Sequence, residues 1–381
     1  MAGAKLRMRF SVLDSWRGLC ALWVALYHFR VFSHINETWL TRHGFIAVDF
    51  FFALSGFVIA HAYGEQLGGL AERVRFFIRR FGRLYPLHIA TLLVVLAMET
   101  ARWAAGQAIG HDIGRPTFSG ETSGAALAAN LALVHGVGFF RDFTWNIPSW
   151  SISVELTVCL IYVLTSTLKR PLITALVLAG GASALLYWFA HQHAAEGYTA
   201  LTRGVCGFFM GVLAQRLHAV WRAKGWTLPG WIELSAPVLV FAAMKLWDLK
   251  IWPGSAVMFA VLVFIFAFEA GPLSRLMKAP FLIRWGEVSY SIYLIHYPMI
   301  LFLFGAAAAY GAATGTDLLV QGKGISLNLG SPWIGDLATV IFLGLVIGIA
   351  GLTYRWIESP GRRWFNGLSD RAAANVSGGG R

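Results

Sequence analysis

Residues 17–28 read RGLCALWVALYH, an apolar run with an arginine at its start and a histidine at its end. On a helix, eleven residues at roughly 100° each return to within about 20° of the starting direction, so Arg17 and His28 share one face. Their separation along the axis is about 16 Å at roughly 1.5 Å per residue, about half of a bilayer core. Charged side chains inside a membrane span are costly and mark functional sites. This stretch therefore predicts a membrane-spanning helix with a polar site along one face.

Apolar stretches of similar length recur throughout the chain of 381 residues. Apolar residues make up 57% of the composition and charged residues only 13%, about half of the charge that a soluble domain carries. At roughly 20 residues per span, the sequence predicts an all-α, polytopic transmembrane bundle of about ten spans. We place them at residues 13–32, 44–63, 84–105, 146–167, 171–190, 198–217, 232–248, 254–271, 288–310 and 334–356. The apolar stretch 124–140 is predicted to be a lipid-surface or re-entrant segment.

The positions of the cations account for the net charge of +12 without a nucleic-acid partner. Lys5, Arg7 and Arg9 precede the first span, and the segments that ten spans leave on the same side hold most of the 31 lysines and arginines. Cytoplasmic loops carry such an excess of Lys and Arg. We therefore expect an even number of spans, both termini in the cytoplasm, and no nucleic-acid binding.

The chain is predicted to form one transmembrane domain over residues 1–368, followed by a disordered cytoplasmic tail at 369–381 whose last five residues read SGGGR. We see no internal repeat of the kind that transporters show. Cys20, Cys159 and Cys206 lie in separate apolar stretches, so neither a disulfide framework nor a metal-binding cluster is predicted.

Two layers of polar residues are predicted inside the membrane. The layer near the cytoplasmic face contains Arg17, Arg79, Arg80, Arg83, Tyr85, His88 and Glu358. The layer in the outer half contains His28, Asp49, Glu155 and His296.

Arginine dominates the cytoplasmic layer. Arg80 and Arg83 lie one helical turn apart, and paired guanidinium groups match phosphate oxygens in a bidentate manner. We therefore expect a phosphorylated ligand there. For Arg73 and Arg75, an ordinary basic loop near anionic lipid is the favoured interpretation.

The outer layer is typical of acid–base chemistry. A histidine can take a proton from a hydroxyl group, and a neighbouring carboxylate can orient its ring. His28 with Asp49 or with Glu155 would form such a pair, and the sequence leaves both pairings open. The alternative for each residue alone is an interhelical hydrogen bond.

Six short motifs share one resemblance, and they follow one another from the first expected span to the last. They are LDSWRG at 13–18 leading to His28, AVDFFFALSGF at 47–57, RFGRLYP at 80–86, PSWSISVE at 148–155, SYSIYLIH at 289–296 and IESP at 357–360. In this order they resemble the membrane-bound acyltransferase-3 family, whose opening motif is an Arg followed by a His.

The resemblance implies transfer of an acyl group, commonly acetyl, from a coenzyme A thioester to a hydroxyl of a carbohydrate or related acceptor. It implies that the chain lies in the bacterial inner (plasma) membrane and that acyl-CoA is a substrate, with no tightly bound cofactor. The site residues that follow from it are His28, Asp49 and Glu155 for catalysis, Arg17, Arg80 and Arg83 for the donor, and Trp150, Ser55, Tyr293 and His296 for the acceptor.

These expectations combine into one mechanism. Cytosolic acyl-CoA docks at the inner arginines, its pantetheine arm extends towards His28, and a glycan or lipid-linked acceptor loses its proton there. An acyl-histidine intermediate stays open. Some relatives carry a fused outer hydrolase-like domain, and we expect a version without it. The alternative function is a proton-coupled transporter or flippase of glycan intermediates, because transporters use the same intramembrane residue types.

Overall fold

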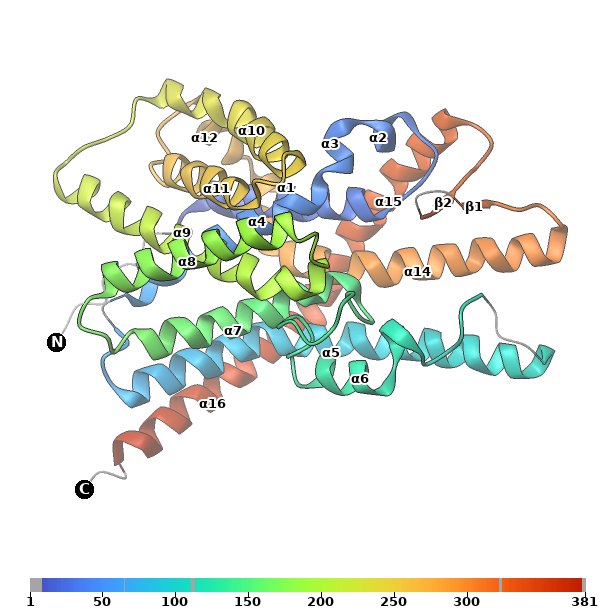
Figure 1. The fold of residues 1–381 in the computed structure, drawn as a ribbon, viewed down its shortest axis with the longest axis horizontal. Coiled ribbons are helices and arrows are strands. Elements are labelled where there is room, and N and C mark those ends of the chain that lie inside the picture. Colours follow the sequence, from blue (N-terminus) through green and yellow to red (C-terminus); the bar gives the residue numbers. More distant parts are fainter. Residues whose placement is uncertain (1–8, 65, 111–113, 322–323, 379–381) are drawn as a thin grey trace.

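The structure is a computed structural model that describes residues 9–64, 66–110, 114–321 and 324–378. Lys5, Arg7 and residues 379–381 lie outside the described residues. Helices make up nearly all of the regular structure in these ranges (Figure 1). The long helices are α1 (Ser11–His28), α4 (Ala47–Tyr63), α5 (Leu70–Ile109), α7 (Trp150–Thr165), α8 (Pro171–His191), α9 (Glu196–Ala223), α10 (Ala236–Asp248), α11 (Trp252–Phe266), α14 (Ser289–Thr314), α15 (Pro332–Thr353) and α16 (Ser359–Gly378).

Short elements connect the long helices. They are α2 (His34–Glu37), α3 (Trp39–Arg42), α6 (Gly124–Leu131), α12 (Pro272–Met277), α13 (Pro280–Glu287), the 3-10 turns η1 (Gly44–Ile46), η2 (Gly120–Thr122), η3 (Ile147–Ser149) and η4 (Gly230–Ser235), and the π-helical turn η5 (Tyr354–Glu358). Strands β1 (Leu319–Gln321) and β2 (Ile325–Leu327) form one antiparallel hairpin in which Leu319 pairs with Leu327.

Each of the ten predicted spans falls on a helix. In the described ranges, seven helical segments are long and apolar enough to cross a membrane, judged by length and composition: Gly44–Tyr63, Leu70–Ile109, Ile147–Thr165, Pro171–His191, Gly230–Asp248, Ser289–Thr314 and Pro332–Ala374. The other three predicted spans lie on α1 and α9, which carry more polar residues, and on α11, which has only 15 residues. The count of ten and the cytoplasmic termini stay predictions.

Glycine and proline set several helix ends. Pro171 and Pro332 begin α8 and α15. Proline suits this position because it has no backbone N–H, and an N–H in the first helical turn would have no partner within the helix. Gly110 and Gly315 end α5 and α14 with φ of +80° and +73°, a backbone conformation that other residues rarely adopt.

Two glycines allow α1 to cross α13 at backbone contact. A Cβ on Gly18 would lie 2.7 Å from the backbone nitrogen of Gly286, and a Cβ on Gly286 would collide with the carbonyl oxygen of Asp14. Because neither glycine has a side chain, the two helices approach closely. The approach brings Arg17, next to Gly18, against the junction between α13 and α14.

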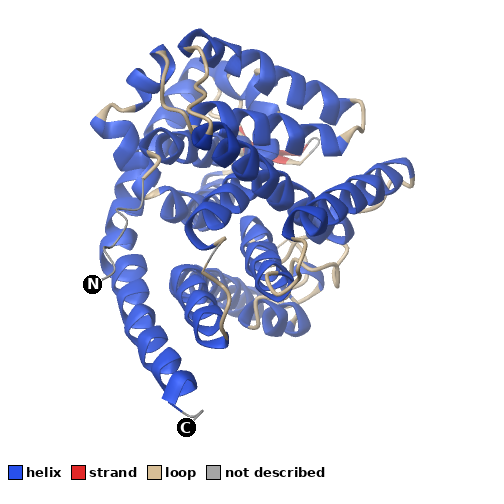
Figure 2. Ribbon diagram, turned by 90° about the vertical axis from the view of Figure 1, so that its left-hand side faces the viewer, coloured by secondary structure: helices blue, strands red, loops and turns tan. Residues whose placement is uncertain are grey.

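The expected disordered tail is wrong for residues 369–378, which continue α16. This helix packs along the first part of α5 (Figure 1). Figure 2, in which the C-terminal end of α16 faces the viewer, shows it at the outer edge of the bundle. Asp370 forms ion pairs with Arg75 and Arg79, at 3.3 and 2.8 Å, and Ser369 is fully buried. Composition alone predicted disorder, and these tertiary contacts with α5 override it.

The stretch 124–140 contains only the short helix α6 followed by irregular chain. Asn130 and His135 are buried, and His88 of α5 bonds the carbonyl oxygen of Asn130 at 2.9 Å. This segment is too short to span a membrane and packs against α5, consistent with a segment that does not cross.

Candidate active site

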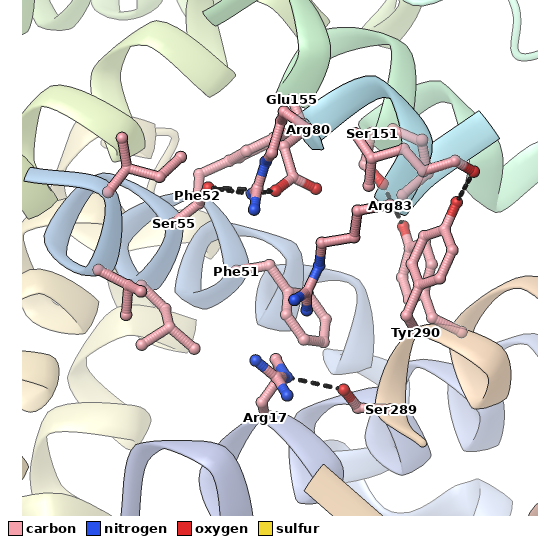
Figure 3. Close-up of a pocket in the computed structure, with 16 residues that line it drawn as sticks. Arg17, Phe51, Phe52, Ser55, Arg80, Arg83, Ser151, Glu155, Ser289 and Tyr290 are labelled. Atoms are coloured by element: carbon pink, nitrogen blue, oxygen red, sulfur yellow. Dashed lines mark hydrogen bonds and ion pairs between the residues drawn. The ribbon is translucent and has the colours of Figure 1, made fainter. Parts of the chain in front are cut away.

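A cavity lies between α1, α4, α5, α7 and α14 (Figure 3). Its charged lining residues are Arg17, Arg80, Arg83 and Glu155, so three cations face one carboxylate. The rest of the wall is mostly apolar or aromatic. We call it the cationic cavity. The structure thus brings together all three residues that the sequence assigned to the donor.

Arg17 is held at the wall by α13 and α14. Its Nε donates to Ser289 Oγ at 2.8 Å (Figure 3). Its Nη2 donates to the Gly286 carbonyl oxygen at 2.7 Å. The same nitrogen lies 3.1 Å from Asp14. These bonds follow from the close crossing of α1 and α13, and they leave the guanidinium group directed at the cavity.

Arg80, Ser55 and Glu155 form a connected group on the opposite wall (Figure 3). Arg80 forms an ion pair with Glu155 and donates from Nη2 to Ser55 Oγ at 2.7 Å. Ser55 Oγ in turn lies 3.1 Å from Glu155 Oε1. Glu155 therefore belongs with the arginines, and its predicted separation from Arg80 into a different layer is wrong. Hydropathy cannot resolve a depth difference of one or two turns.

Arg83 extends from α5 into the cationic cavity (Figure 3). Its side chain forms no hydrogen bond or ion pair with another residue in the described part of the chain. Glu358, which is buried on the π-helical turn, instead accepts a hydrogen bond from Ser291 Oγ at 2.8 Å. Arg83 is thus a cation with donors left for a ligand.

Two aromatic rings, those of Phe51 and Tyr293, lie in the wall of the cationic cavity. Phe51 and Tyr293 pack edge to face at 5.5 Å between ring centroids. The Tyr293 hydroxyl donates to the Pro148 carbonyl oxygen at 3.0 Å and lies 2.8 Å from Ser151 Oγ. The ring of Tyr293 lies 6.0 Å from that of His296, so the cavity wall at Tyr293 adjoins this histidine.

His28, the last residue of α1, pairs with a second histidine. His28 Nδ1 lies 3.1 Å from His296 Nε2, and the two ring centroids are 5.1 Å apart. Arg17 and His28 both contact α14, as expected for residues on one face. Neither Asp49 nor Glu155 bonds His28 among the described contacts, so both pairings that the sequence left open are wrong.

Asp49 instead neutralises a buried arginine. Arg203 of α9 donates from Nε to Asp49 Oδ1 at 2.5 Å, and Ser255 Oγ donates to Asp49 Oδ2 at 2.6 Å. Arg203 also bonds the Phe45 carbonyl oxygen at 3.0 Å and lies over the ring of Trp150 at 5.6 Å. Asp49 therefore fixes the packing of α4, α9 and α11.

Trp150 does not line the cationic cavity. It is buried, with its ring stacked on Phe143 at 4.7 Å and Arg203 over it. Of the four residues that the resemblance assigned to the acceptor, Ser55 and Tyr293 line the cavity. His296 is fully buried beside His28.

Sequence reasoning missed Arg203. It lies inside the predicted span 198–217, so the argument that singled out Arg17 applies to it equally. Its side chain is only 9% exposed, which makes it one of the most buried cations of the structure.

In the described ranges, no three His, Cys, Asp or Glu side chains gather closely enough to hold a metal ion. Cys20, Cys159 and Cys206 are each buried, and each is a free thiol.

These features define an integral membrane protein with an arginine-rich cavity and, next to the wall residue Tyr293, a histidine pair. A family model described as an acyltransferase domain, acyltransferase-3, matches residues 10–360. The chain belongs to this family of acyltransferases. No solved structure matches it.

Three relatives illustrate the similarity. Protein 2 of the picA locus of Rhizobium radiobacter is 34% identical over 192 residues, which cover 47% of this chain and 93% of that protein. A Staphylococcus aureus (strain COL) protein, named as a predicted O-acetyltransferase, is 25% identical over 381 residues, which cover 92% of this chain and 57% of that protein. Acyltransferase MdmB of Streptomyces mycarofaciens is 26% identical over 354 residues, or 84% of this chain and 81% of that protein. The chain thus spans little more than half the length of the staphylococcal relative.

Proposed function

We propose that this chain is an O-acyltransferase that moves an acyl group, acetyl in the simplest case, from acyl-CoA to a hydroxyl of a glycan or related acceptor. The observation that carries the proposal is the cationic cavity, in which three arginines face one carboxylate. Tyr293 in its wall lies 6.0 Å from His296, the partner of His28. Family membership and the names of two relatives support the reaction class.

The charge of the cavity suits the phosphates of coenzyme A. Arg83 has unused donors, and charge-assisted hydrogen bonds from arginine to phosphate are among the strongest that proteins make. Arg17 and Arg80 add to the potential, since Glu155 offsets only one of the three positive charges. The apolar lining that follows, including Phe51 and Phe52, suits the pantetheine arm.

The proton chemistry is assigned to His28. In our proposal the thioester carbonyl reaches the region beyond Tyr293, where the ring of His296 lies 6.0 Å away and His28 touches His296. The acceptor hydroxyl gives its proton to His28 as its oxygen bonds the carbonyl carbon. The C–S bond then breaks, and the thiolate of coenzyme A takes that proton from His28.

The acceptor is proposed from chemistry alone. A hydroxyl-bearing glycan or lipid-linked sugar is consistent with the O-acetyltransferase name of the staphylococcal relative. We place the reaction in the bacterial inner membrane, where cytosolic acyl-CoA is available on one side.

The test uses the purified full chain in lipid nanodiscs with acetyl-CoA and a panel of glycans, read by mass spectrometry. We expect acetyl transfer, and loss of it by about 10²- to 10⁴-fold in His28→Ala, the usual contribution of a general base. CoA binding should persist. His191→Ala, an exposed histidine at the end of α8, is the matched control. Substantial transfer by His28→Ala would reject the base, and glycan movement without thioester loss would favour the transporter.

A further inference from the structure

Three contacts of the histidine pair determine where its protons lie. His28 Nδ1 lies 3.0 Å from the Val24 carbonyl oxygen and 3.1 Å from His296 Nε2. His296 Nδ1 lies 3.3 Å from the Ile292 carbonyl oxygen. A carbonyl oxygen only accepts hydrogen bonds, so both Nδ1 atoms carry the hydrogen. His296 Nε2 then carries a lone pair and accepts from His28 Nδ1–H, whose single hydrogen is shared between this nitrogen and the Val24 carbonyl oxygen.

The opposite arrangement fails. If His296 Nε2 donated to His28 Nδ1, the lone pair of His28 Nδ1 would face the Val24 carbonyl oxygen. In a neutral His296, the lone pair of Nδ1 would face the Ile292 carbonyl oxygen in the same way. Only the first arrangement satisfies all three contacts, and it leaves His28 Nε2 as the free base. His28 is partly exposed, and Nε2 makes no hydrogen bond within the described residues.

We infer that His296 is a positioning residue that holds His28 in the Nδ1–H tautomer and accepts a hydrogen bond from its imidazolium form. The inference rests on the proposed function. When the acceptor proton reaches Nε2, the positive charge spreads over the His28 ring and strengthens the bond from Nδ1–H to His296 Nε2. No proton passes to His296, which keeps its own hydrogen on Nδ1.

His296 therefore takes the place that a carboxylate holds in many acid–base sites. Within the described residues no carboxylate bonds either histidine. The titratable or charged groups around the pair are Tyr27 and Arg30 near the end of α1, and Tyr293 and Tyr297 on α14.

The same geometry argues against His296 as an acceptor-binding residue. Its exposed fraction is 0%, and both ring nitrogens are used within the protein. A substrate hydroxyl would have to displace either Ile292 or His28. The role that the family resemblance assigned to it is therefore replaced by a role that acts through His28.

The experiment compares His296→Leu with His296→Gln, in nanodiscs, with acetyl-CoA and whichever glycan of the panel the wild type acetylates. We expect Leu to lower kcat by about 10- to 100-fold, with the KM for acetyl-CoA within about twofold of wild type, because partners that orient a reactive group contribute on this scale. Gln retains an acceptor oxygen and should recover kcat to within about tenfold of wild type. His218→Leu, a buried histidine among phenylalanine rings, is the control for loss of a buried imidazole.

The outcomes separate the inference from the proposed function. Wild-type kcat in His296→Leu, with His28→Ala inactive, overturns the inference alone. The inference is also overturned if kcat falls and KM for acetyl-CoA rises to the same extent in both His296 variants and in His218→Leu, because the loss of a packed side chain then explains the effect. If His296→Leu no longer binds CoA, the Gln variant decides. A normal KM with a kcat within about tenfold of wild type supports the inference, and a normal KM with a kcat lowered by more than about 100-fold rejects it. Substantial transfer by His28→Ala would instead reject His28 as the base of the proposed function, and absence of acyl transfer by the wild type would reject the proposed function itself.

Discussion

Replacement of Arg83 by glutamine tests the donor site most directly. The side chain extends into the cationic cavity with no ion pair of its own among the described residues, so the change removes no ion pair of the fold. Each hydrogen bond to a charged group contributes about 1.5–3 kcal/mol. At about 1.4 kcal/mol per tenfold, we expect Arg83→Gln to weaken CoA binding by roughly 10- to 100-fold.

The assay is calorimetric titration of CoA into protein in nanodiscs, at low and at moderate salt. Thermal unfolding is measured in parallel, and we expect its midpoint to shift by less than about 3 °C, the equivalent of roughly 1 kcal/mol in a chain of this size. Arg275→Gln, an exposed cation on α12, is the matched control. Arg80→Gln should lose both affinity and stability, since it leaves Glu155 without its partner. A CoA Kd within twofold of wild type in folded Arg83→Gln would refute the donor assignment, and so would an equal loss in Arg275→Gln.

Two further predictions concern how the site is held. Asp49→Asn leaves the buried Arg203 without a counter-charge and should cost about 3–5 kcal/mol of stability. A double variant that also changes Arg203 to Met should cost less than the sum of the two single changes. Strict additivity of the free energies of chemical unfolding would contradict the pairing. Gly18→Ala places a Cβ 2.7 Å from the α13 backbone and should cost about 1–3 kcal/mol, whereas Gly180→Ala in α8 meets no atom within 4 Å and should be neutral or slightly stabilising. Equal thermal midpoints for these two glycine variants would contradict the close crossing of α1 and α13.

The helices were predictable because their signal is local. Apolar stretches of about 20 residues, ended by Gly or begun by Pro, depend only on neighbours in the chain, and each of the ten predicted stretches lies on a helix. The grouping of Arg80 with Arg83 was also local, since one helical turn separates them. The prediction of disorder at 369–378 failed because this segment is ordered by contacts with α5, through Arg75 and Arg79.

Partners across helices were not predictable. Hydropathy assigned Glu155 to the depth of His28, and only packing of α7 against α5 shows that it pairs with Arg80. Asp49 had two open roles until α9 supplied Arg203, 154 residues away. Each of these choices depends on helix rotation and on depth to within a few ångströms, which no spacing in the chain encodes.

The sequence by itself determined the class of this protein: an α-helical membrane bundle, with Arg17 and His28 on one helix face, because helix periodicity and hydrophobicity are properties of consecutive residues. The tertiary structure alone decided which groups meet. It placed Arg17 with Arg80 and Arg83 around one cavity, and it gave His28 a histidine for its partner where a carboxylate was expected. The physical reason is that hydrogen bonds act over about 3 Å, so the chemistry of the site depends on how the helices pack.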